Sequence, residues 1–77
     1  MRDMEFTIEG NKEKLNIGQE VNILEGKLPS SYYYFIENAI GMSANFTNSK
    51  RLKTRVGTVK EIKETPRFNI AVLEFDE

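Results

Sequence analysis

Five glycines and two prolines divide this chain of 77 residues into short pieces. The glycines are at positions 10, 18, 26, 41 and 57, and the prolines are at 29 and 66. Most of the pieces between them either alternate apolar and polar residues or are rich in β-branched and aromatic residues, as strands are. The spacing therefore predicts four or five short strands joined by turns.

The alternation is clearest near the N-terminus, where Met4, Phe6 and Ile8 share one face of a predicted half-buried strand. Gly10 and Asn11 break this strand. Further strands are expected over 20–25, after a turn at Gly18, and over 55–63.

The last third of the sequence predicts an irregularity in one strand and the position of another strand in the sheet. Val59 and Ile62 have opposite parity, so a regular strand cannot bury both, and we expect a bulge or a strong twist near 57–60. Pro66 falls in a predicted hairpin connection. The last strand is apolar on both faces, so it should lie in the centre of the sheet or between two layers.

The segment 31–40 allows two interpretations. Tyr32 to Ile36 is aromatic and β-branched, which favours a strand. A helix capped by Ser31 and ended by Gly41, with Ala39 and Ile40 on its apolar face, is the alternative. A long loop over about 37–52 follows, with Met42 and Phe46 as its apolar contacts and with room for a helical turn near 48–52, capped by Asn48 or Ser49.

A sheet this small hides its edges by bending on itself. The sequence therefore predicts one all-β domain over residues 1–77, a small five-stranded bent barrel.

The chain contains no Cys and no His. Disulfides, thiolate and imidazole metal sites, and Ser-His or Cys-His nucleophile pairs are therefore excluded within the sequence. The Asp and Glu residues show no spacing that would place them around a pocket. We therefore expect that the protein is not an enzyme, and we expect no catalytic residue, no cofactor and no metal ion. No apolar run has the length of a signal peptide or a membrane span, which favours a cytoplasmic location.

Charge is unevenly distributed along the sequence. Residues 50–67 hold seven basic and two acidic residues, whereas the segments before and after carry −3 each. Clustered Lys and Arg suit a polyanion, and a strand over 51–55 would align Arg51, Lys53 and Arg55. The alternative is a solvated strand face with Glu61 and Glu64 as local partners. The candidate binding residues in this segment are Lys50, Arg51, Lys53, Arg55 and Lys60.

The aromatic run Tyr32–Phe35 can form a stacking surface for bases or for a peptide. Neighbouring residues of a strand face opposite ways, so Tyr32 and Tyr34 are the exposed pair if Tyr33 and Phe35 are buried, or the reverse. Ordinary core and edge packing is the competing interpretation.

Three segments carry a family resemblance: IGQEVNIL at 17–24, GTVKEI at 57–62 and IAVLEFD at 70–76. Their pattern resembles the SH3-like small barrels and, among them, the KOW-type modules. The pattern consists of Gly18 ahead of Val21 and Ile23, followed by Gly57-x-Val59-x-x-Ile62. Similar endings occur in small bacterial proteins. The segment 27–50 is longer than a KOW module needs. The resemblance implies a binding module that contacts RNA, proteins or peptides.

We therefore expect a non-enzymatic binding module, a monomer or weak homodimer, that binds another protein through Tyr32, Tyr34 and the loop 41–49. The second hypothesis is RNA or DNA binding through the basic segment, helped by a tyrosine. The third is an accessory subunit of an enzyme without chemistry of its own.

Overall fold

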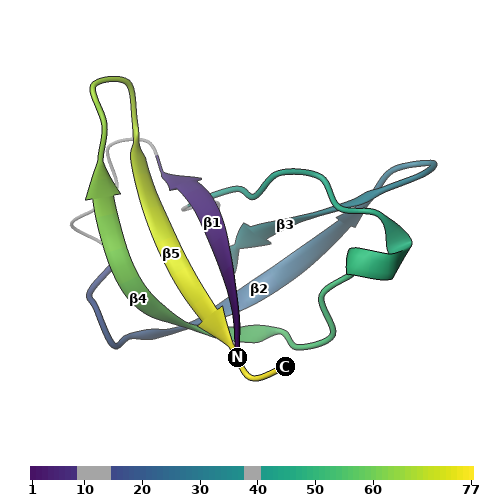
Figure 1. The fold of residues 1–77 in the computed structure, drawn as a ribbon, viewed down its shortest axis with the longest axis horizontal. Coiled ribbons are helices and arrows are strands. Elements are labelled where there is room, and N and C mark those ends of the chain that lie inside the picture. The colour runs from purple at the N-terminus through teal and green to yellow at the C-terminus, as the bar shows by residue number, and fades with distance from the viewer. Residues whose placement is uncertain (9–14, 38–40) are drawn as a thin grey trace.

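The computed structural model describes residues 1–8, 15–37 and 41–77. The described elements are β1 (Arg2–Ile8), β2 (Glu20–Lys27), β3 (Tyr32–Ile36), the 3₁₀ helix η3 (Asn48–Lys50), β4 (Val56–Glu64) and β5 (Asn69–Phe75) (Figure 1). The strand interpretation of 32–36 is thereby confirmed. The predicted break at Gly10 and Asn11, and the positions Ala39 and Ile40 of the helical alternative, lie outside the described residues.

The five strands form one sheet in the order β1-β5-β4-β2-β3, and every neighbouring pair is antiparallel. The sheet curls into a nearly closed all-β barrel, which is compatible with an SH3-like small barrel. The predicted central place of the last strand is confirmed, because β5 lies between β1 and β4. The two chain ends lie side by side at one end of the barrel (Figure 1).

A short non-strand segment, 42–46, fills the space between β3 and β1. The Thr7 amide donates to the Met42 carbonyl at 2.8 Å, and the Met42 amide donates to the Thr7 carbonyl at 3.1 Å. On the other side, Met42 bridges Phe35 and Phe46 bridges Tyr32. Met42 and Phe46, the two apolar residues expected to hold this loop, therefore do so largely through backbone contacts. These backbone contacts nearly close the barrel.

The predicted irregularity in β4 is a bulge. Val59 pairs with Leu73, but the next pair is Glu61 with Val72, so Lys60 is an extra residue on β4. The bulge shifts the parity of the strand. Val59 is buried and Ile62 packs against the same core, which a regular strand could not achieve.

The turn before β2 begins the contacts between β2 and β4. Gly18 has a φ of 91°, a conformation that favours glycine. Its amide donates to the Val59 carbonyl at 2.7 Å, and the Val59 amide donates to Gln19 at 2.9 Å. The predicted turn at Gly18 is confirmed.

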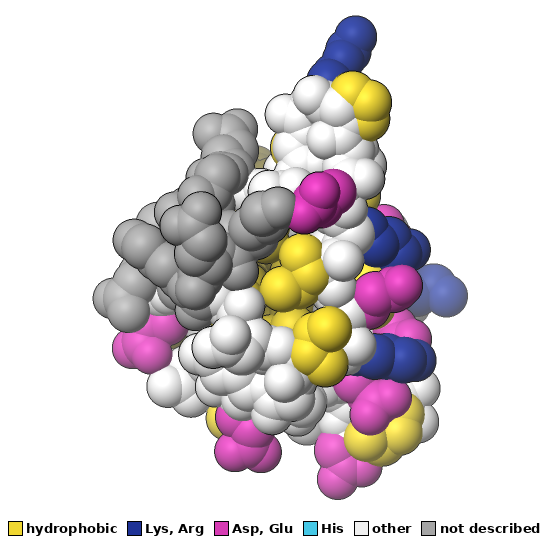
Figure 2. Space-filling view, turned by 90° about the vertical axis from the view of Figure 1, so that its left-hand side faces the viewer, with side chains coloured by type: hydrophobic (Ala, Val, Ile, Leu, Met, Phe, Trp, Pro, Cys, Tyr) yellow, Lys and Arg dark blue, Asp and Glu magenta, His cyan; other side chains and the backbone are white. Residues whose placement is uncertain are grey.

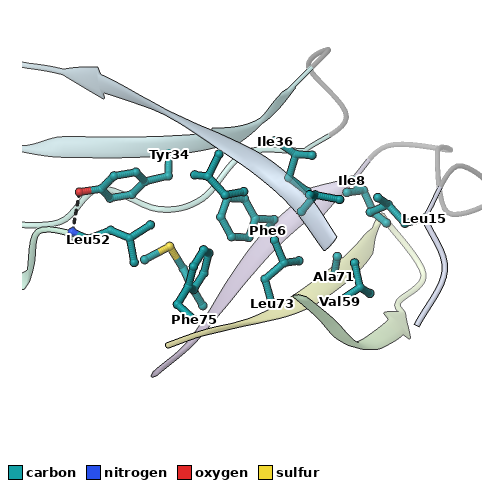
Figure 3. Packing of buried hydrophobic residues seen from close by; sticks show 13 residues of the cluster. Phe6, Ile8, Leu15, Tyr34, Ile36, Leu52, Val59, Ala71, Leu73 and Phe75 are labelled. Carbon is teal, nitrogen blue, oxygen red and sulfur yellow. Dashed lines mark hydrogen bonds between the residues drawn. The ribbon is translucent and has the colours of Figure 1, made fainter. Parts of the chain in front are cut away.

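The core is one elongated cluster inside the barrel. It runs from Tyr34 and Leu52 at one end to Ile8 and Leu15 at the other (Figure 3). Its buried members are Met4, Phe6, Ile8, Leu15, Val21, Ile23, Tyr34, Ile36, Leu52, Val59, Ala71, Leu73 and Phe75.

The segment 50–55 closes one end of the barrel, and we call it the closing segment. The strand expected over 55–63 is confirmed as β4, whereas residues 51–54 belong to no strand, so the strand over 51–55 that would have aligned Arg51, Lys53 and Arg55 does not form. The helical turn before it is confirmed as η3, but its N-cap is Thr47, without a side-chain hydrogen bond, instead of Asn48 or Ser49. Leu52 enters the core and is 1% exposed.

Replacing Leu52 tests the closure. Leu52→Ala should lower the free energy of unfolding by about 3 kcal/mol, because it removes buried methyl groups and leaves a cavity. Urea denaturation followed by circular dichroism measures this. Leu28→Ala is the matched control, since Leu28 is 39% exposed, and it should cost less than about 1 kcal/mol. Equal costs for the two variants would contradict a core role for Leu52.

Candidate functional site

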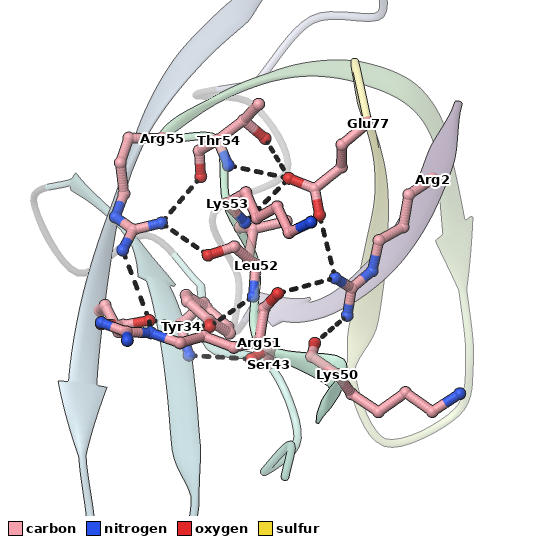
Figure 4. A network of polar contacts seen from close by, with 11 residues as sticks. Arg2, Tyr34, Ser43, Lys50, Arg51, Leu52, Lys53, Thr54, Arg55 and Glu77 are labelled. Atoms are coloured by element: carbon pink, nitrogen blue, oxygen red, sulfur yellow. Dashed lines mark hydrogen bonds and ion pairs between the residues drawn. The ribbon is translucent and has the colours of Figure 1, made fainter. Parts of the chain in front are cut away.

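The closing segment is attached to the barrel through the hydroxyl of Tyr34. The Leu52 amide donates to this oxygen at 2.7 Å (Figure 4). The hydroxyl donates to Glu25 Oε2 at 2.9 Å. Tyr34 is 0% exposed. Its hydroxyl therefore joins β2, β3 and the closing segment at the end of the core.

Glu25 in turn holds two arginines of the closing segment. Arg51 binds it with two nitrogens, Nε at 2.9 Å from Oε2 and NH2 at 2.7 Å from Oε1. The Arg55 guanidinium lies 3.4 Å from the same carboxylate. Arg51 also lies over the Tyr32 ring, 4.5 Å from its centroid. The bidentate geometry makes Glu25 and Arg51 a specific pair.

These contacts shift two pKa values. The hydrogen bond from Arg51 lowers the pKa of Glu25 from 4.5 to about 2, against the opposing effect of burial. Burial raises the pKa of Tyr34, and the neighbouring Glu25 carboxylate acts in the same direction. Glu25 is therefore ionised and Tyr34 is protonated at neutral pH, as the hydrogen bonds between them require.

The sequence-predicted exposure of Tyr34 is wrong, because Tyr34 faces the core. Tyr32 lies on the same side of β3 and is half-buried beneath Arg51. Ile36, two residues further along the same face, is also buried. The apolar Ile36 on this face is the sequence signal that could have placed Tyr34 inside.

The basic residues of 50–67 do not converge on one face. Lys60 pairs with Asp3 at 2.9 Å, and Lys63 lies 3.4 Å from Glu5, both across β5 on β1. The hydrogen bond and charge of Asp3 raise the pKa of Lys60. Arg67 lies in the β4–β5 connection, at the opposite end of the barrel from the closing segment (Figure 1).

Lys50 and Lys53 sit on the closing segment and make no ion pair with any residue that the structure describes. On the face that Figure 2 shows, Lys and Arg side chains are interleaved with Asp and Glu side chains. The structure thus brings Tyr32, Tyr34, Arg51 and Arg55 together around Glu25, and it leaves Lys60 elsewhere. Most of this basic segment has partners within the chain.

An apolar row crosses the outside of the barrel on the other side of β3. Leu24 pairs with Phe35, and Phe35 bridges Met42. Directly opposed residues of antiparallel strands point to the same face. Leu24 is 45% and Met42 is 53% exposed, and Phe35 is half-buried between them. We call Leu24, Phe35 and Met42 the apolar row.

Tyr33 extends this row along β3. Its ring stacks with Phe35 at a centroid distance of 6.1 Å. It also covers Gly26, its partner on β2, so closely that a Cβ there would lie 2.1 Å from the ring. The glycine therefore lets the tyrosine ring lie flat on the sheet. The sequence-based candidates Tyr32 and Tyr34 lie on the opposite face of β3 from this row.

A shallow hollow of about 390 Å³ lies beside the closing segment and is lined by Met1, Glu20, Thr54, Arg55, Val56, Thr58, Glu74 and Asp76. Among the described residues, no group of three or more Asp or Glu side chains is arranged to hold a metal ion. In the same residues, no helix has the length and apolar character to cross a membrane.

Comparison with protein-family models, with curated proteins and with solved structures finds no match for this chain.

The role of the Tyr34 hydroxyl can be tested by removing it, with Tyr33 on the same strand as the matched control. Tyr34→Phe should cost about 2 kcal/mol of unfolding free energy, because it leaves the buried Leu52 amide without its acceptor. Tyr33→Phe should change stability by less than about 0.5 kcal/mol, since the Tyr33 hydroxyl lies outside the core. Chemical denaturation of both variants checks this. A neutral Tyr34→Phe would show that the hydroxyl does not hold the closing segment.

The lowered pKa of Glu25 predicts an acid dependence of stability. A carboxyl whose folded pKa is depressed stabilises the fold above its unfolded pKa, and this contribution disappears as pH falls through its folded pKa. Glu25→Gln should therefore cost about 2 kcal/mol at pH 7. Its difference from the parent chain should shrink as pH falls from 4.5 towards 2.

Urea denaturation between pH 7 and pH 2.5 measures this difference. Glu61→Gln, at an exposed position of β4, is the control and should stay within about 0.5 kcal/mol of the parent. A Glu25→Gln effect that is independent of pH would contradict the ion pair as its cause.

Proposed function

We propose that this protein is a non-enzymatic binding module whose partner is another protein. The binding surface is the apolar row of Leu24, Phe35 and Met42 with the neighbouring Tyr33. The observation that carries the proposal is the continuity of this row across β2, β3 and the segment 42–46.

Continuity distinguishes the row from the other exposed apolar side chains. Ile17 and Phe68 are 69% and 38% exposed and lie in different connections, the turn before β2 and the β4–β5 connection. Val56 is 47% exposed and lines the hollow together with Met1, but no aromatic side chain of the described residues joins them there. Single exposed apolar residues are normal, whereas a contiguous patch that includes aromatic rings is typical of an interaction site. Tyrosine and phenylalanine are also enriched in the buried centres of protein interfaces.

We expect the partner to bind through side-chain contacts with the row and not by adding a strand to the edge of the sheet. The edge of β3 that faces away from β2 is already bridged by Met42 and Phe46. A partner peptide would have to displace these backbone contacts in order to extend the sheet. We therefore expect a partner that presents an apolar face to Leu24, Phe35 and Met42.

The contacts of the basic residues favour a protein over a nucleic acid. Arg51 and Arg55 are bound to Glu25, and Lys60 is bound to Asp3. A phosphate backbone would have to compete with these carboxylates for the same cations. The KOW-type likeness of the sequence makes RNA the alternative that the experiment must include.

Paired surface variants test the proposal. The double variant Leu24→Ser, Met42→Ser removes the two ends of the row, and the double variant Val56→Ser, Phe68→Ser removes similarly exposed apolar groups elsewhere. Affinity capture from the source cells identifies candidate partners, and calorimetry with the purified partner measures affinity. The first variant should weaken binding about tenfold or more, and the second should leave it unchanged.

Two further measurements decide between the alternatives. Sedimentation velocity of the parent chain shows whether the row pairs with a second copy. A chemical-shift titration with mixed single-stranded RNA at about 50 and 200 mM salt tests the nucleic-acid alternative, whose shifts should vanish at the higher salt. We expect no localised shifts over 50–60, and salt-sensitive shifts there would overturn the protein-binding proposal.

A further inference from the structure

We infer that Arg2, Lys53 and Thr54 form a carboxylate-binding site that Glu77 of the same chain occupies, and that binds a carboxylate of another molecule when Glu77 leaves. We call the four donor groups of this site the nest: the Lys53 amide, the Thr54 amide, the Thr54 hydroxyl and the Arg2 guanidinium. The inference is independent of the apolar row and does not rest on the proposed function.

The nest contacts both oxygens of the Glu77 carboxylate. Oε2 accepts hydrogen bonds from the Lys53 amide at 2.9 Å, the Thr54 amide at 2.8 Å and the Thr54 hydroxyl at 2.9 Å (Figure 4). Oε1 accepts from Arg2 at 3.1 Å. Successive backbone N–H groups that point at one oxygen are a recurrent way of binding an anion.

Contacts that do not involve Glu77 hold the donors in place. Arg2 donates to the Lys50 carbonyl at 2.6 Å. Arg55 donates to the carbonyls of Leu52 at 2.9 Å and Thr54 at 3.0 Å. Leu52 itself is fixed in the core. The nest should therefore keep its shape after Glu77 leaves, and a preorganised site loses little affinity to ordering.

Glu77 can leave without disturbing the sheet. β5 ends at Phe75, which is also the last residue of β5 paired with β1, opposite Arg2. The Glu77 backbone makes one further hydrogen bond, from its amide to the Phe75 carbonyl at 2.9 Å. Withdrawal of Glu77 therefore breaks the contacts of the nest and one local bond, and it leaves every strand pair intact.

The surroundings of the nest favour a carboxylate with a single negative charge. Thr54 also lines the hollow of about 390 Å³, whose acidic residues are Glu20, Glu74 and Asp76 and whose apolar residues are Met1 and Val56. The one cation among the described residues that line it, Arg55, is already paired with Glu25. Three nearby carboxyl groups disfavour a phosphate dianion more than a monoanion. A peptide carboxylate fits the nest, with the rest of the peptide in the hollow.

The protonation state of Glu77 agrees with this geometry. Burial alone would raise its pKa, but the hydrogen bonds from Thr54, Lys53 and Arg2 outweigh burial, so the pKa lies below its ordinary value. The nest thus holds the anionic form, as a site for external carboxylates must.

Acetate is the probe that tests the nest. We would record amide spectra of the labelled parent chain and of Glu77→Ala during an acetate titration, with sodium chloride at matched ionic strength as the reference. In Glu77→Ala, the amides of Lys53 and Thr54 should shift and saturate. In the parent chain the apparent affinity should be about tenfold weaker or more, because Glu77 already occupies the site.

Two further variants keep the result interpretable. Glu61→Ala removes an exposed carboxylate of β4 that lies outside the hollow and should respond as the parent does. Glu77→Gln keeps a neutral acceptor near the nest, so acetate should displace it more readily than it displaces Glu77. The same spectra report whether each variant is folded.

Three outcomes would overturn the inference. The first is a folded Glu77→Ala with no acetate-dependent shift at Lys53 and Thr54 that exceeds the chloride reference. The second is an equal response of the parent chain and Glu77→Ala. The third is stronger binding of inorganic phosphate than of acetate, which would replace the carboxylate assignment with a phosphate site.

Discussion

The hydroxyl of Tyr34 is the interaction on which the rest of this barrel depends. It lies at the end of the core, accepts from the Leu52 amide and donates to Glu25. A buried hydroxyl is costly unless it is hydrogen-bonded, so its two partners are fixed together with it. Leu52 then fills the end of the core, and Glu25 is positioned to bind Arg51 and Arg55. One polar group in an apolar cluster thus orders β2, β3 and the closing segment.

The same arrangement explains why a cluster of charge in the sequence is not a cluster in space. Four basic residues of 50–67 meet acids that are distant along the chain: Arg51 and Arg55 meet Glu25 at the closed end, and Lys60 and Lys63 meet Asp3 and Glu5 across the sheet. Charge runs are local in sequence, whereas ion pairs follow the strand order. Only the strand order β1-β5-β4 reveals that Lys60 and Lys63 face acidic residues of β1.

Sequence reasoning succeeded where the governing pattern is local. Period-two alternation located β1 and β2, and aromatic and β-branched content favoured a strand at β3. Opposite parity predicted the bulge beside Val59, and the doubly apolar last strand predicted the central place of β5. It failed where the choice depends on distant contacts. The aromatic run by itself leaves two solutions, which only the parity of Ile36 could have separated, and the hydrogen bonds of Tyr34 with Leu52 and Glu25 are visible only in the fold. The sequence-based candidate Tyr34 therefore lies on the inner face of β3.

Both proposed surfaces follow from the way in which the barrel is closed. The segment 42–46 places Met42 beside Phe35, and the closing segment presents the amides of Lys53 and Thr54 to Glu77. In a domain this small, few side chains are free of a structural role. Tyr34, Glu25 and Leu52 hold the fold, so their substitution should impair any function indirectly. Leu24, Met42 and Glu77 lie outside the core, and binding can be altered at these positions while the barrel stays intact.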